Sequence, residues 1–106
     1  GGHSELGAGI HKNLLEEMNR ILAHSPLFED EIEDYKTQII KDISDSHVSY
    51  WQPKDAILAE LDEIITADFG ILSEEDKIAL KTRRKLFENP EANKIKVNVK
   101  SGIHDL

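Results

Sequence analysis

The stretch PLFEDEIEDYKTQIIKDIS, residues 26–44, carries the clearest helical pattern in the chain. Ser25 can cap the start of a helix, Pro26 suits its first turn, and the acids that follow favour the positive end of the helix dipole. The apolar residues then recur every three or four positions, which places them on one face of an α-helix: Phe28, Ile32, Tyr35, Ile39 and Ile43. The pattern predicts a helix over residues 27–44.

Segments on both sides of this stretch show the same spacing of apolar residues. Pro53 fits the first position of a helix, and Gly70 can adopt the left-handed conformation that ends one. Ser73 and Asp76 have the spacing of a capping box, in which each side chain accepts the backbone N–H of the other residue. Together with the apolar stripe before Ser25, these signals predict helices over residues 10–24, 53–69 and 73–88.

The predicted helices leave a segment at each end of the chain. Residues 1–9 begin Gly-Gly-His-Ser, and we expect a flexible N-terminus that is a remnant of a cloning tag. The apolar residues of 95–99 alternate with polar ones as in a strand, but no second strand pattern can pair with them. The sequence therefore predicts an all-α fold, a compact four-helix domain with an extended, basic C-terminal tail, over residues 10–90 and 91–106.

The apolar stripes also predict which side chains form the hydrophobic core. We expect the side chains that share one face of each helix to pack together, since only that face can be removed from water. The predicted core consists of Leu14, Met18, Ile21, Phe28, Ile32, Tyr35, Ile39, Ile57, Leu61, Ile64, Ile65 and Leu86.

The composition favours one small domain inside the cell. A chain of 106 residues is long enough for one hydrophobic core. It has no cysteine, whereas a secreted domain of this size usually needs a disulfide framework. No apolar run approaches the roughly 20 residues that span a bilayer, and the N-terminus lacks a signal-peptide pattern. We therefore expect an intracellular protein with no membrane segment.

The charge of the chain is unevenly distributed. The net charge is −8, but residues 1–76 carry 18 acids against 5 Lys and Arg, whereas residues 77–106 carry 3 acids against 8. An acidic body repels phosphate, so binding to nucleic acid would depend on the basic part alone. The alternative is that the acidic and basic parts attract each other within the fold.

No motif indicates catalysis, a cofactor or a bound metal. The five histidines lack the helical spacing of metal ligands, and no glycine-rich phosphate loop occurs. Glu60, Asp62 and Glu63 could serve as paired acid and base, but their positions beside an apolar stripe favour a solvated outer face. The sequence therefore predicts a protein that is not an enzyme and has no catalytic residue, metal, cofactor or small-molecule substrate.

Two features are candidates for binding another protein. Tyr50 and Trp51 either seal the end of the domain or face a partner. The second feature is a cluster of carboxylates near the start of the helix predicted over 27–44, which repel one another: Glu29, Asp30, Glu31, Glu33 and Asp34. These acids are either used to bind a basic partner or neutralised within the fold by bases that lie opposite, namely Lys77, Lys81 and Arg84.

A basic run near the end of the chain supports an alternative function. It starts on one face of the helix predicted over 73–88, from which Arg83 is turned away, and continues into the tail. Such a stripe neutralises a few phosphates and gives weak affinity that depends on salt and not on sequence. The alternative is therefore a nucleic-acid-binding domain that uses Lys77, Lys81, Arg84, Lys85, Lys94 and Lys96.

The order of these elements resembles the PWI domain, a four-helix module of pre-mRNA splicing factors. The resemblance covers roughly residues 11–97 and rests on AILAELDEII at 56–65 and on EEDKIALKTRRKLFENPEANKIKV at 74–97. The Pro-Trp-Ile signature of the family would fall on Lys12-Asn13-Leu14, where only the apolar third position is kept. The chain thus resembles a PWI variant without the signature.

The resemblance implies a function in mRNA splicing and a place in the nucleus. Some PWI domains bind RNA or DNA through a basic flank beside the helices, whereas variants without the signature serve as protein–protein modules. The acidic body favours the second behaviour, so we expect a scaffold that binds another protein with a basic surface. A third hypothesis is an acidic inhibitor that masks a basic partner with residues 27–44.

Overall fold

The structure, a computed structural model, describes residues 3–44 and 49–97. A short 3-10 turn, η1 (Pro26–Phe28), and two two-residue strands, β1 (His3–Ser4) and β2 (Ser49–Tyr50), accompany four helices. The helices are α1 (Ile10–His24), α2 (Glu29–Ser44), α3 (Lys54–Ala67) and α4 (Glu74–Phe87). The predicted four-helix fold is confirmed, and each helix begins and ends within two residues of its expected position.

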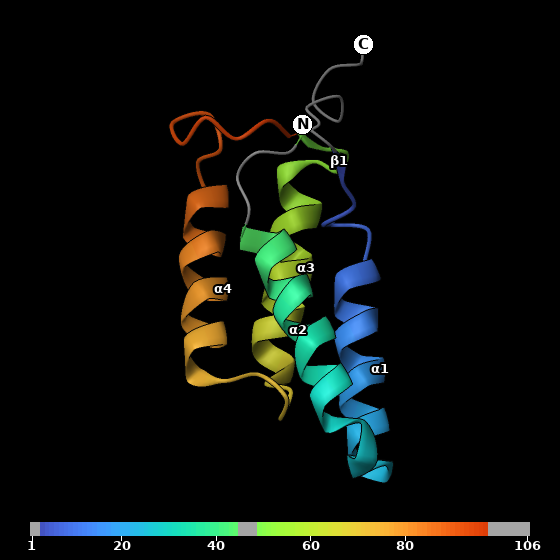
Figure 1. Ribbon diagram of the computed structural model, residues 1–106. Helices are drawn as coiled ribbons and strands as arrows, with labels where there is room; N and C mark the ends of the chain where they lie inside the picture. Colours follow the sequence, from blue (N-terminus) through green and yellow to red (C-terminus); the bar gives the residue numbers. More distant parts are fainter. Residues whose placement is uncertain (1–2, 45–48, 98–106) are drawn as a thin grey trace.

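The helices pack side by side, with α1 and α4 on opposite sides of α2 and α3 (Figure 1). Helices α1 and α4 each contact both α2 and α3, so the apolar faces of all four meet in one core. The largest fully buried side chains in that core are Leu6, Leu15, Ile43, Ile57, Leu61, Ile64, Leu80 and Phe87.

A left-handed residue marks the end of α3, and a pair of hydrogen bonds marks the start of α4. The predicted capping box is present: Ser73 Oγ accepts the N–H of Asp76, and the Asp76 carboxylate accepts the N–H of Ser73. Helix α3 ends differently from our expectation, because Asp68 and not Gly70 adopts the left-handed conformation, with φ 50°. Asp tolerates this conformation since its short side chain can hydrogen-bond locally.

The predicted core is half correct. Six of its members are buried, namely Met18, Ile32, Ile39, Ile57, Leu61 and Ile64, while Ile65 and Leu86 are half-buried. The prediction was wrong for four residues that are exposed: Leu14, Ile21, Phe28 and Tyr35. Leu15 and Phe87 are fully buried beside Leu14 and Leu86. Neighbouring helical residues point about 100° apart, so an apolar pair does not reveal which member faces inward.

The N-terminal segment differs from the flexible leader that we expected. Leu6 is fully buried, and β1 pairs in parallel with β2, with Ser4 opposite Tyr50. Gly7 has φ 104°, and a Cβ atom there would lie 2.7 Å from Gln52 Cβ, so glycine is needed at this close approach. Residues 3–9 are therefore part of the fold, and their origin as a tag stays a prediction.

Glu60 holds this segment in place, although we expected it on an outer face. Its side chain comes from α3, is 2% exposed and accepts three backbone N–H groups. Oε1 accepts from Gly7 (2.5 Å) and Gly9 (3.0 Å), and Oε2 accepts from Lys12 (2.8 Å). Since the Gly9 N-cap has no side chain of its own, Glu60 supplies the cap that α1 lacks.

The first residues of the predicted tail are folded against the domain. Residues 91–94 form turns, and Ile95 and Val97 are partly buried against the core. The Lys96 carbonyl accepts the N–H of Tyr50 at 2.8 Å, so β2 is bonded by β1 on one side and by the tail on the other. Residues 98–106, the rest of the predicted extended tail, lie outside the described residues.

Candidate functional site

The acid cluster lies on the outer surface of α2. All five carboxylate residues are exposed: Glu29, Asp30, Glu31, Glu33 and Asp34. Three of them occupy the first turn, where the helix dipole stabilises negative charge. Glu33 pairs with Lys36 of the same helix at 2.8 Å. The others have no basic partner within residues 3–44 and 49–97, so most of this charge points outward.

The contact between α2 and α4 uses a buried lysine instead of these acids. Lys36 is almost fully buried, and its Nζ lies 2.6 Å from Asp76 Oδ2. Burial opposes both charged forms, but the mutual hydrogen bond, with those from Glu33 and Ser73, outweighs it. The pKa of Lys36 is therefore raised and the pKa of Asp76 lowered. This pair joins the two helices, and Glu33 is the one member of the acid cluster that contributes to it among the described residues.

Two bases of α4, Lys77 and Arg84, pair with acids other than those of α2. Lys77 Nζ lies 2.5 Å from Asp68 Oδ1, and Arg84 bonds Asp62 and Glu88. The hydrogen bond from Arg84 lowers the pKa of Asp62, and the same bond raises the pKa of Arg84. The neutralisation of the α2 acids by Lys77 and Arg84, which we considered as an alternative, is therefore not found.

The remaining members of the basic run are exposed. Lys81 and Lys85 lie on α4, and Lys94 and Lys96 follow it. In the described part of the chain none of these four side chains pairs with an acid. Arg83 is turned away from these lysines, as expected, and the structure also buries it, at 4% exposed. The nucleic-acid residues predicted from the sequence thus divide into paired Lys77 and Arg84 and four exposed lysines.

Tyr50 belongs to the core and not to a binding surface, so that assignment was wrong. It is 4% exposed, and its hydroxyl accepts a hydrogen bond from Arg83 Nη2 at 2.7 Å. Its ring packs edge to face against the ring of Phe87, with the ring centroids 4.9 Å apart, and the Arg83 guanidinium lies over the same Phe87 ring. Trp51 is 51% exposed, so it is Tyr50 that seals this end of the domain. The dipeptide alone did not show which ring turns inward.

Six apolar side chains of α1, η1 and α2 are exposed, and we call them the apolar edge: Ile10, Leu14, Ile21, Leu27, Phe28 and Tyr35. We had assigned four of them to the core and none to a site. The width of the apolar stripe of α1 could have identified the three members of the apolar edge on that helix, because residues 10–22 hold six large apolar side chains in all. These side chains of residues 10–22 spread over about 140° of α1, which is wider than the face that packing against neighbouring helices buries.

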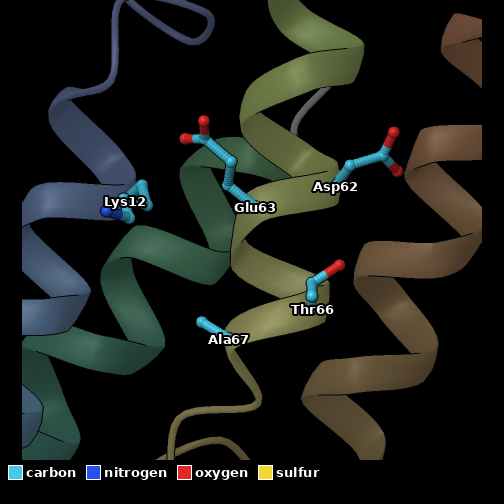
Figure 2. A pocket seen from close by; sticks show the side chains of 5 residues that line it. All are labelled: Lys12, Asp62, Glu63, Thr66 and Ala67. Atoms are coloured by element: carbon cyan, nitrogen blue, oxygen red, sulfur yellow. The ribbon is translucent and has the colours of Figure 1, made fainter.

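A shallow groove of about 440 Å³ lies on the outer face of α3, lined by Lys12, Asp62, Glu63, Thr66 and Ala67. Figure 2 shows the Glu63 carboxylate on the side of α1 and the Asp62 carboxylate pointing toward α4. Asp62 bonds Arg84, and Lys12 lies 3.6 Å from Glu16. Two of the three charged groups of the groove are thus paired with residues outside it.

The described residues contain neither a cluster of three His, Asp or Glu side chains that could hold a metal ion nor a helix long and apolar enough to cross a bilayer.

Comparison of the chain with models of known families, with curated proteins and with solved structures finds no match. The resemblance to PWI domains therefore depends on the quoted residues alone.

Proposed function

We propose that this chain is a non-catalytic protein–protein interaction module that binds a partner with a basic surface, within an RNA-processing assembly of the nucleus. Helix α2 is the partner-facing element. The observation that carries the proposal is the outward charge of α2, whose clustered acids are exposed while Lys77 and Arg84 of α4 pair with other acids. The place in RNA processing follows from the resemblance to PWI domains.

The acid cluster carries an electrostatic cost. Like charges three or four residues apart on a helix repel one another, and the dipole compensates only those in the first turn. Asp34 lies beyond that turn, and Glu33 is offset only by Lys36. A surface that keeps such charge raises the local negative potential and speeds the approach of a basic partner.

Charge reversal tests the proposal. The variant combines Glu31→Lys with Asp34→Lys, and the matched control combines Glu63→Lys with Glu91→Lys, exposed acids outside α2. We expect wild type and control to capture the same proteins from a nuclease-treated cell lysate, and the α2 variant to lose them. Its stability should fall only slightly, because Lys in the first turn costs about 0.3–1 kcal/mol.

Two results would contradict the proposal. The first is equal capture by the variant, the control and the wild type, which would leave α2 as an ordinary solvated face. The second is the loss of all captured proteins after nuclease treatment of the wild-type sample. That result would favour the second candidate, a weak nucleic-acid-binding domain, which the exposed Lys81, Lys85, Lys94 and Lys96 support.

A further inference from the structure

The apolar edge occupies one side of α1. At 100° per residue, Ile10, Leu14 and Ile21 lie within about 40° of one another around the helix. Asn19 lies about 140–180° away from them, and its Oδ1 accepts the N–H of Ile71, just after α3. The exposed apolar residues are therefore on the side of α1 that faces away from α3.

The apolar edge continues on α2. Tyr35 and Lys36 lie on opposite sides of the buried stripe formed by Ile32, Ile39 and Ile43. Lys36 reaches α4 through Asp76, and α2 packs against both α1 and α4. Tyr35, which is 67% exposed, must therefore lie on the α1 side of α2. The exposed apolar residues of both helices border the same seam.

The two helices also bring these residues to within about one helical turn of one another. Helices α1 and α2 run antiparallel from the turn at residues 25–28, as Figure 1 shows. Counted from the middle of that turn, Tyr35 lies level with Met18, which places it about one helical turn from Leu14 and from Ile21 along α1. From Ile10 to Ile21 the edge extends about 16 Å at 1.5 Å per residue. It is thus a strip about three helical turns long.

Carboxylates border this strip. Glu31 and Asp42 lie within about 40° of Tyr35 on the solvent side of α2. Glu17 lies beside Leu14 and Ile21 on α1, where it pairs with Arg20. Contiguous apolar surface rimmed by polar groups is typical of an interaction site, and here the rim is mainly acidic.

We propose that the apolar edge binds an amphipathic helix of a partner protein, with apolar anchors at helical spacing and Lys or Arg on its flanks. This inference rests on the proposed function and names the class of partner. The apolar anchors would fill the seam between Leu14 and Tyr35, and the basic flanks would meet Glu31 and Asp42. A second copy of this chain fits less well, because a two-fold contact would bring acidic rims together.

The test uses three labelled helical peptides of about 18 residues, roughly five turns. One carries Leu at positions i, i+4, i+7 and i+11 with Lys on the flanks. The second replaces each Lys by Glu, and the third keeps the Lys but scatters the Leu around the helix. We expect fluorescence anisotropy to show binding of the first peptide at least about tenfold tighter than that of the others.

Two variants locate the binding surface. Leu14→Gln combined with Tyr35→Gln should weaken binding of the Lys-flanked peptide by about tenfold or more, as expected when central apolar contacts are removed. Ile78→Gln removes an exposed apolar side chain of α4 and should leave binding unchanged. Thermal melting of both variants checks that the fold is intact.

Equal affinity for the three peptides, or equal binding by the two variants, would overturn the inference. Sedimentation provides a further check. If the free chain forms a dimer that the combined Leu14→Gln and Tyr35→Gln variant dissociates, the inference is also overturned, because a second copy of the chain then occupies the apolar edge. If peptide binding fails while lysate capture still depends on Glu31 and Asp34, the proposed function stands and only this inference is lost.

Discussion

Glu60 is the residue that joins the N-terminal segment to the helices. Its two carboxylate oxygens accept all three of the hydrogen bonds described above, whereas a glutamine amide has one accepting oxygen and one donating nitrogen. Glu60→Gln should therefore leave a buried N–H unsatisfied and lower the free energy of unfolding by about 1–3 kcal/mol. Urea denaturation measures the change.

The control for this prediction is Glu63→Gln, on the same helix but exposed. Surface substitutions of this kind usually change stability by no more than about 0.5 kcal/mol. Equal midpoints for the two variants would mean that the Glu60 bonds contribute nothing to the fold.

Asp76 makes the stability depend on pH in the acidic range. Its folded-state pKa lies below its ordinary value of 3.8, so the ionised form stabilises the fold. That contribution is complete above about pH 5 and is lost as the pH falls through the folded-state pKa. The contribution of Lys36 depends on pH in the opposite direction. Its pKa is raised above 10.5, so its contribution to stability is lost only in strong alkali.

Asp76→Asn should flatten the acid part of this profile. We expect the free energy of unfolding to fall by about 1.5–3 kcal/mol at neutral pH, which is the value of a hydrogen bond to a charged group. Between neutral pH and about pH 2, the variant should then lose less stability than the wild type does. Glu75→Gln, the exposed neighbour, should follow the wild-type curve. The measurement is the free energy of unfolding in urea at several pH values, and parallel curves for Asp76→Asn and wild type would contradict the assignment.

Helix α2 combines a buried face with an exposed apolar residue of the same stripe. Ile39 is 8% exposed and Tyr35 is 67% exposed, although they are one turn apart. Ile39→Ala should cost about 2–5 kcal/mol because it opens a cavity in the core. Tyr35→Ala should change stability by no more than about 0.5 kcal/mol. Thermal or urea melting decides, and similar losses in both variants would show that Tyr35 packs in the core.

Over residues 3–44 and 49–97, the molecule presents an acidic face on α2 and four exposed lysines on and after α4. If these four lysines contact phosphate, we expect only weak binding to RNA, with a slope of log K against log salt no steeper than about −3 to −4. Lys81→Gln with Lys85→Gln should flatten that slope by about one unit per lost contact. Arg84→Gln should not, because Arg84 already pairs with Asp62 and Glu88. A salt titration by filter binding measures the slopes, and a change caused by Arg84→Gln would reverse this assignment.

The helices themselves were predictable because their signals are local. Apolar spacing, Pro26 before α2, Pro53 before α3 and the Ser73–Asp76 capping box each act within a few residues of the chain. The exposure of the α2 acids was predictable too, since a helix that buries its Ile face must expose the opposite one. The sequence alone therefore determined the fold class and the position of the acidic face.

Only the tertiary structure decided how the helices share their apolar residues. Leu14 and Leu15 are equally apolar, and the neighbours of α1 determine which of them is buried. The same holds for Glu60, Tyr50 and Arg83, whose partners lie 33 to 53 residues away in the chain. Hydrogen bonding to such distant groups offsets the cost of burying polar atoms, and no local pattern encodes it. The apolar edge arises for the same reason, since it is what remains exposed once α1 and α2 have packed.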